Sequence, residues 1–146
     1  MISMPVPFEI IEHTADLRLR ATGQSPQDLF VNALKGMAEI IKPGLGVEAG
    51  GGAGFAETSR QFSVNSVDLA ALLVDFLNEA LYLGNVHKEI YTGVNFSAFD
   101  DARCEGKLKG VAVQGFDKDI KAATHHDLTI TRRSDGYLEA TIVLDI

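Results

Sequence analysis

The sequence has a single cysteine, Cys104, which excludes an internal disulfide and a zinc site built on several thiolates. This cysteine usage indicates a cytoplasmic protein. Residues 1–8 lack a basic region followed by an apolar run, so no signal peptide is expected. The most apolar segment, residues 69–83, is interrupted by three polar residues, and we expect it not to span a membrane.

Basic residues are also scarce, since 13 Lys and Arg stand against 20 Asp and Glu and the net charge is −7. This balance argues against a stand-alone nucleic-acid binder, which would present a basic face to phosphates. It fits a solubilised domain, a cation binder or a partner for a basic protein surface. The sequence contains no P-loop, nucleophile elbow or metalloprotease helix. Residues 44–49 match the sequence pattern of a dinucleotide-binding loop, but a predicted helix rather than a strand precedes them. We therefore do not expect a dinucleotide site there.

The chain of 146 residues, 46% of them apolar, suits one domain over residues 1–146. Apolar residues at helical spacing predict a helix that starts after Ser25 and ends near Ile41, and a second helix that opens at 66–68. Period-two alternation predicts strands at 17–22, 60–64 and 137–146, and residues 90–99, 103–113 and 127–133 are also predicted to be strands. Residues 8–11 are a short apolar run that suits a strand or an extended entry, and a loop through Gly115 and Asp117 leads to residues 120–123.

Two pairs of these strands are predicted to form hairpins, one across residues 100–101 and one across residues 134–136. Strands so close in sequence are expected to be antiparallel. We therefore predict an α+β domain. It is a two-layer sandwich in which two amphipathic helices pack on one face of a mixed, mostly antiparallel sheet.

The last residues, Asp145 and Ile146, end a strand in which Leu138, Ala140, Ile142 and Leu144 share one face. A terminal carboxylate would then be held in a sheet one residue from Asp145. Asp16 begins a strand near the other end of the chain, and alone it is more typical of a turn or cap. Two such carboxylates at one sheet edge would repel each other, and a divalent ion such as Ca²⁺, Mg²⁺ or Mn²⁺ would relieve that repulsion.

Three further side chains, Lys121, His125 and His126, are candidates for a functional site, and each can also be an ordinary surface group. Lys121 is either a surface lysine with a buried stem or a cation that faces a phosphate or a partner carboxylate. His125 and His126 would point to opposite faces of a strand, so they are not expected to share one ion. His126 is more often a surface group in such a place, although it can act near a site. Cys104 is expected in the core.

Four motifs in this order resemble the archease family, and the resemblance covers nearly the whole chain. They are Glu12-His13-Thr14-Ala15-Asp16, the helix over residues 69–83, Ile120-Lys121-Ala122-Ala123-Thr124-His125-His126 and Ile142-Val143-Leu144-Asp145-Ile146.

The resemblance implies a two-layer fold with a divalent metal near the chain ends, held by Asp16, Asp145 and the carboxylate of Ile146. Members of the family act as protein cofactors of the GTP-dependent RNA ligase that joins tRNA exon halves. They promote guanylylation of a ligase histidine and multiple turnover. The resemblance thus implies no catalytic residue in this chain, and contact with RNA only through the ligase.

By the same resemblance, the family's lysine falls on Lys121 and its motif histidine on His126. These two residues and His13 are candidates for contact with the partner or a phosphate. His125 stands where the family usually has tyrosine, which weakens any role for that side chain.

Two other functions compete with this one. A chaperone-like interaction module for RNA-modifying enzymes would need an exposed apolar patch and would act without metal. A metal-dependent hydrolase would need a general base beside the ion, for which His13 and His126 are the only nearby candidates.

Overall fold

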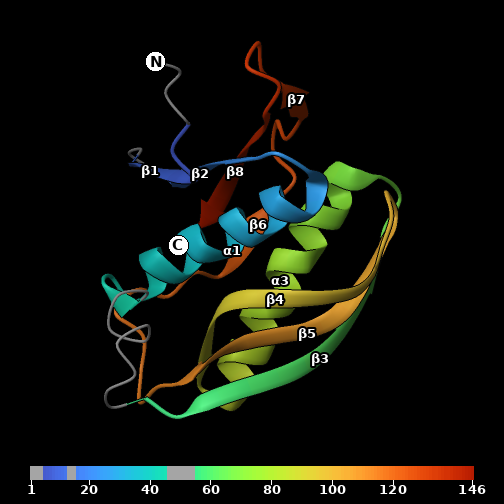
Figure 1. Cartoon of the computed structure of the whole chain (residues 1–146). Helices are drawn as coiled ribbons and strands as arrows, with labels where there is room; N and C mark the ends of the chain where they lie inside the picture. Colours follow the sequence, from blue (N-terminus) through green and yellow to red (C-terminus); the bar gives the residue numbers. More distant parts are fainter. Residues whose placement is uncertain (1–4, 13–15, 46–54) are drawn as a thin grey trace.

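The structure is a computed structural model that describes residues 5–12, 16–45 and 55–146 (Figure 1). His13 and residues 46–54, most of a glycine-rich stretch over residues 44–54, therefore lie outside the described residues. The elements, in chain order, are β1 (Phe8–Glu12), β2 (Leu17–Gly23), α1 (Pro26–Ile41), β3 (Glu57–Asn65), α3 (Leu69–His87), β4 (Glu89–Phe99), β5 (Arg103–Ala112), β6 (Ala122–Thr124), β7 (Ile130–Arg132) and β8 (Leu138–Asp145).

The described strands form two antiparallel sheets. Sheet A has the order β1-β2-β8-β6, and β7 also pairs with β8. Sheet B has the order β3-β5-β4. The predicted α+β class and both predicted hairpins are confirmed. The structure differs from the prediction of a single sheet. Strand β3 pairs with β5 of the β4–β5 hairpin and forms sheet B, whereas β8 pairs with β2 in sheet A.

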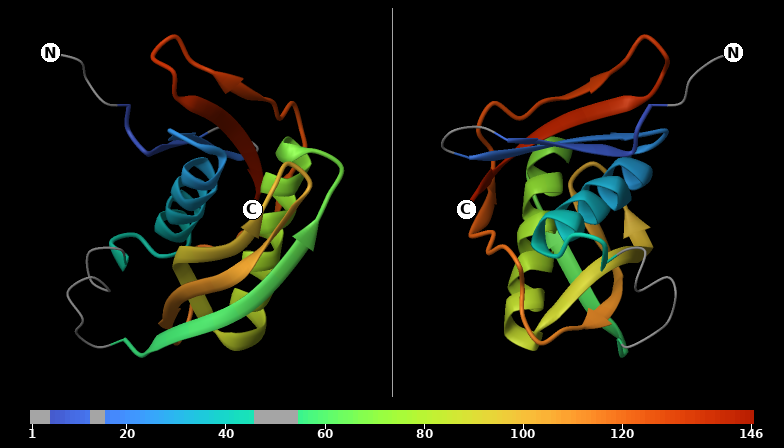
Figure 2. Two further views of the ribbon diagram at one scale, coloured as in Figure 1. Left: turned by 45° about the vertical axis from the view of Figure 1, so that its right-hand side comes forward. Right: turned by 90° about the vertical axis from the view of Figure 1, so that its left-hand side faces the viewer.

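The two helices lie between the sheets rather than on one face of a single sheet (Figure 2). Helix α1 contacts β1, β2 and β8 of sheet A and β4 of sheet B. Helix α3 contacts β6 of sheet A and all three strands of sheet B. Successive residues of a helix are about 100° apart, so the three consecutive buried residues Leu72, Leu73 and Val74 cannot face one side. Burial on several sides is what a position between two sheets requires.

Five phenylalanine side chains join the two helices to sheet B. Their ring centroids lie 5.0–6.4 Å apart, mostly in tilted or edge-on arrangements. Such aromatic pairs contribute packing energy beyond the area that they bury. The five rings belong to Phe30, Phe62, Phe76, Phe96 and Phe99.

Cys104 lies beside this cluster and is fully buried, as predicted. Its burial, with a smaller contribution from Asp100, raises the pKa of the thiol to about 12.

Both helices begin at a capping side chain, and the Ser25 cap was predicted. The Ser25 hydroxyl accepts a hydrogen bond from the Asp28 main-chain N–H at 3.2 Å. Asp68 caps α3 by accepting from the Ala71 N–H at 2.8 Å. Helix α3 runs to His87, and its length and composition alone would suffice for a membrane span. It contributes eight buried residues along its length, so we assign it to the core of the domain.

Candidate metal centre

Asp16 and Asp145 come to opposing positions at one end of sheet A. Leu17 pairs with Leu144 in the ladder between β2 and β8; Asp16 precedes Leu17, and Asp145 follows Leu144. Opposing residues of an antiparallel pair share one face, with Cβ atoms about 5 Å apart. This register puts both carboxylates on the face that points away from the buried leucines. The structure thus brings two of the predicted metal ligands together.

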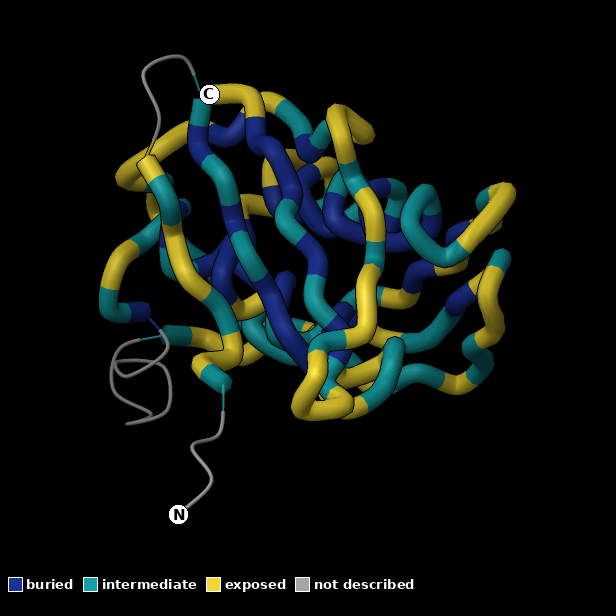
Figure 3. The backbone as a smooth tube through the Cα atoms, turned by 90° about the horizontal axis from the view of Figure 1, so that it is seen from above, coloured by how far each residue is buried: buried dark blue, intermediate teal, exposed yellow. Residues whose placement is uncertain are grey.

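Strand β6 brings Lys121 to the same end of sheet A. Ala122 pairs with Asp145, and the main-chain N–H of Lys121 donates a hydrogen bond to the Asp145 carbonyl oxygen at 2.8 Å. One step further along this register, Lys121 is opposite Ile146. The end of β8 is exposed although most of the strand is buried (Figure 3). The predicted ligands and the predicted lysine therefore share an accessible edge.

Helix α3 holds β6 in this position through one asparagine. The Asn78 side-chain amide donates to the Ala123 carbonyl oxygen at 3.0 Å and accepts from the Ala123 N–H at 2.8 Å. Ala123 follows Ala122, the partner of Asp145. The asparagine therefore fixes the strand that carries Lys121 against the rest of the fold.

The donor set at this edge fits a hard divalent cation such as Ca²⁺, Mg²⁺ or Mn²⁺, because such ions prefer carboxylate and carbonyl oxygens. The Asp16 carboxylate already lies 3.6 Å from Nε of Arg18, and its side chain is 19% exposed. In the described part of the chain, no three His, Cys, Asp or Glu side chains gather in a way that could hold an ion. An ion between Asp16 and Asp145 would therefore have to complete its coordination with other oxygens, such as main-chain oxygens, the Ile146 carboxylate or water.

The histidines of the 120–126 motif lie beyond the other end of β6. His126 Nε2 is 3.1 Å from Asp127 Oδ2, and His125 Nε2 is 3.9 Å from Asp75 Oδ1. The two imidazoles thus have different acidic partners. Because β6 separates His126 from Lys121, the structure does not bring His126 to the paired carboxylates.

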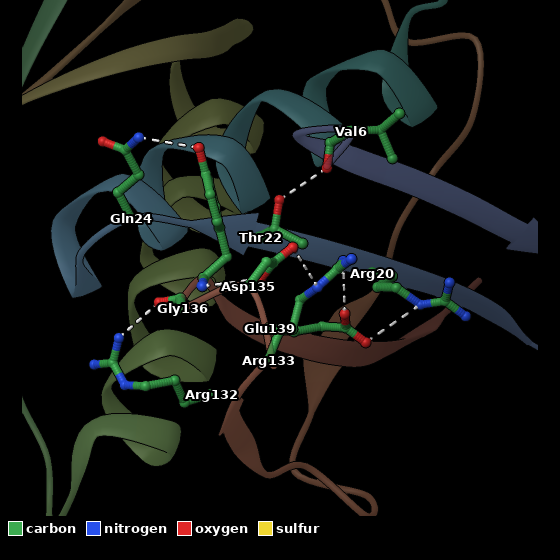
Figure 4. Close-up of polar contacts among 10 residues, drawn as sticks. Val6, Arg20, Thr22, Gln24, Arg132, Arg133, Asp135, Gly136 and Glu139 are labelled. Atoms are coloured by element: carbon green, nitrogen blue, oxygen red, sulfur yellow. Dashed lines mark hydrogen bonds and ion pairs between the residues drawn. The ribbon is translucent and has the colours of Figure 1, made fainter. Parts of the chain in front are cut away.

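Arginines on the outer face of sheet A are largely paired with carboxylates (Figure 4). Arg20 Nε lies 3.8 Å and Arg133 Nη1 lies 3.1 Å from oxygens of Glu139. Arg133 Nε also lies 3.3 Å from Asp135. Paired arginines offer little free positive charge to a phosphate chain. The arginines of this face therefore act mainly in ion pairs with acidic side chains of the same domain.

A buried polar cluster in sheet B was not anticipated from the sequence. Glu89 is 4% exposed, and Arg60 binds its carboxylate through two hydrogen bonds of 2.8 Å. The Tyr91 hydroxyl donates to the same carboxylate at 2.6 Å. The bonds from Arg60 hold the pKa of Glu89 below its usual range despite burial, while burial and Glu89 raise the pKa of Tyr91. The sequence feature that could have indicated this cluster is the spacing of Glu89 and Tyr91, because residues two apart in a strand share one face.

The chain is similar to known proteins over its full length. The model of the Archease protein family (MTH1598/TM1083) matches residues 8–146. The protein archease of Methanosarcina acetivorans is 32% identical and that of Methanopyrus kandleri 29% identical, and the alignments cover 100% and 97% of this chain and 100% of each relative.

Solved structures agree with this comparison. Protein 1598 of Methanobacterium thermoautotrophicum has a TM-score of 0.71 at 26% identity, and the match covers 96% of this chain and 99% of the other. An archease of Thermotoga maritima, described as a possible chaperone, has a TM-score of 0.64 at 18% identity with full coverage of both chains. The second likeness bears on the fold alone.

Proposed function

The chain belongs to the archease family, and from that premise we propose that it is a protein cofactor of a GTP-dependent RNA ligase. In this role it promotes guanylylation of the ligase histidine and multiple turnover in tRNA splicing or RNA repair, in the cytoplasm. It is not itself the catalyst. The ligase is its partner, and RNA is reached only through the ligase.

The observation that carries the proposal is the opposed pair Asp16 and Asp145 at the accessible end of sheet A. These carboxylates and the α-carboxylate of Ile146 would hold a divalent ion, with Ca²⁺, Mg²⁺ and Mn²⁺ as candidates. Few protein ligands leave coordination positions that water, a ligase group or a nucleotide phosphate can complete. Lys121, next to this edge, contacts a phosphate or the partner.

Two features of charge support a ligase rather than free RNA as the direct partner. The net charge is −7, and the arginines of the outer face of sheet A are paired with acidic side chains. An acidic domain docks more readily on a basic protein surface than on a phosphate chain.

The test combines metal binding with ligase activation. Calorimetric titration with Ca²⁺, Mg²⁺ or Mn²⁺ is compared between the wild type and the Asp16→Asn and Asp145→Asn variants, and each protein is then assayed for stimulation of ligase guanylylation. We expect both variants to lose metal affinity and stimulation. Asp101→Asn, an exposed acidic residue in the β4–β5 turn, is the charge-matched control. Full stimulation by both site variants would refute the metal site.

A chaperone-like interaction module is the second candidate, because several large apolar side chains of the described chain are exposed. It would suppress aggregation of unrelated client proteins without need of metal. The large exposed apolar residues of the described chain lie on several segments, and Tyr82 and Val86 are one helical turn apart on α3; this distribution favours a specific partner over broad client binding. They are Val6, Ile10, Val67, Tyr82, Val86 and Ile146.

A further inference from the structure

A groove runs along the outer surface of the C-terminal half of α3, next to the first residues of β6. It has a volume of about 530 Å³ and is lined by α3 side chains together with Lys121 and Ala122. Tyr82 and Val86 are one helical turn apart in this lining and are 62% and 56% exposed. Two large apolar side chains that share one surface groove mark a contact surface rather than scattered exposure.

The groove is continuous with the candidate metal centre. Ala122, part of its lining, pairs with Asp145, and the Lys121 N–H donates to the Asp145 carbonyl oxygen at 2.8 Å. A molecule seated against Tyr82 and Val86 would therefore lie beside the paired carboxylates. A partner that uses the carboxylate edge would cover the groove as well.

The chemistry of the groove fits a protein side chain better than a nucleic acid. Lys121 is the one charged side chain among its described lining residues, and the ammonium has no ion pair within the described chain. The Asn78 amide is already bonded to Ala123. A phosphate chain needs several cations, whereas one lysine beside an apolar wall suits an apolar side chain with an oxygen acceptor next to it.

We propose that this groove is the docking surface for the RNA ligase, an inference that rests on the function proposed above. An apolar side chain of the ligase sits against Tyr82 and Val86, and a neighbouring carboxylate or carbonyl oxygen accepts a hydrogen bond from the Lys121 ammonium. An anchor of this kind excludes water and carries a large share of the binding energy. It seats the ligase so that the carboxylate edge faces it.

The experiment measures ligase affinity and metal affinity separately. Val86→Asp and Tyr82→Ser alter exposed groove positions, so the core remains intact. Val67→Asp is the matched control, because Val67 is 87% exposed and lies just before the start of α3, at the opposite end of the helix from Val86. Ligase binding is measured by fluorescence anisotropy, Ca²⁺ binding by calorimetry, and folding by thermal unfolding followed by circular dichroism.

We expect Val86→Asp and Tyr82→Ser to weaken ligase binding at least tenfold with Ca²⁺ affinity unchanged, and Val67→Asp to bind as the wild type does. If the wild type binds and stimulates the ligase and both groove variants bind equally well, the docking inference is wrong and the proposed function stands. If the wild type neither binds nor stimulates a cognate ligase, the proposed function and the docking inference are both wrong.

Discussion

The side-chain amide of Asn78 forms two hydrogen bonds with the main chain of Ala123, one donated at 3.0 Å and one accepted at 2.8 Å. One residue of α3 thereby satisfies two main-chain groups of the short strand β6. Because Ala122 pairs with Asp145, this contact links the core helix to the candidate metal centre.

Replacement of Asn78 by alanine is predicted to destabilise the protein by about 1–3 kcal/mol, since two partly buried main-chain groups lose their partner. Urea unfolding measures the loss, and hydrogen exchange of the Ala123 amide shows whether β6 loosens. Asn85→Ala changes an exposed asparagine of the same helix and serves as the control. Equal stability of the two variants would contradict this role of Asn78.

The Glu89 carboxylate predicts a dependence of stability on pH. Its folded pKa lies below the usual 4.5. Its interactions therefore stabilise the fold fully above about pH 4.5, and this contribution is lost as pH falls through the folded pKa. We expect Glu89→Gln to remove part of the acid-induced loss of stability, as measured by urea unfolding between pH 7 and pH 3. If the free energy of unfolding of Glu89→Gln depends on pH as that of the wild type does, the Glu89 carboxylate does not make this contribution.

Removal of Arg60 tests the same cluster from the side of the cation that stabilises the charged form of Glu89. In Arg60→Ala the buried Glu89 has lost its cation, so its pKa rises and its charged form becomes unfavourable. The stability deficit relative to the wild type is then largest at neutral pH and shrinks toward pH 4. Paired urea titrations at the two pH values check this, and a deficit that is constant with pH would contradict it.

Gly84 allows α3 to approach the start of β4. A Cβ atom at this position would lie 2.6 Å from the Glu89 carbonyl oxygen, which is closer than real contacts allow. Alanine is intrinsically better than glycine in a helix by about 1 kcal/mol. The main-chain clash outweighs this gain, and we expect Gly84→Ala to destabilise the fold by about 1–3 kcal/mol.

Thermal unfolding of Gly84→Ala beside Gly115→Ala checks that prediction. Gly115 has open space around its Cα, so its alanine variant should be as stable as the wild type or slightly more so. A stabilising effect of Gly84→Ala would contradict the close approach.

The Cys104 thiol should be inert in the native protein. It is fully buried, and its pKa of about 12 leaves almost no thiolate at neutral pH. We expect no reaction with a thiol reagent at pH 8 until denaturant is added. We also expect Cys104→Ser to be less stable than Cys104→Ala by about 1–3 kcal/mol, because the serine hydroxyl would be buried in an apolar core that offers it no hydrogen bond.

The sequence predicted local structure well because helices, hairpins and caps depend on neighbouring residues. Ser25, the hairpin turn at Gly136 and the last strand through Leu144 are examples in which short-range spacing decides the outcome. The spacing also put Asp16 and Asp145 at strand ends. Their shared edge became evident only with the ladder between β2 and β8.

The division into two sheets could not be read from the sequence. Period-two alternation shows which residues of a strand face the core, but it does not show which strand pairs with which. The pairing of β3 with β5 joins segments separated by α3 and β4, and its register appears only in the folded chain. For the same reason the contact between Arg60 and Glu89, 29 residues apart, was not predicted.

The most direct test of the account is ligase-histidine guanylylation with GTP and a divalent metal, measured under multiple turnover with and without this protein. We predict a marked increase in turnover with the wild type, and its loss when Asp145 and Ile146 are deleted. Stimulation by the deleted protein equal to that of the wild type, or no stimulation of a cognate ligase by either, would contradict the account.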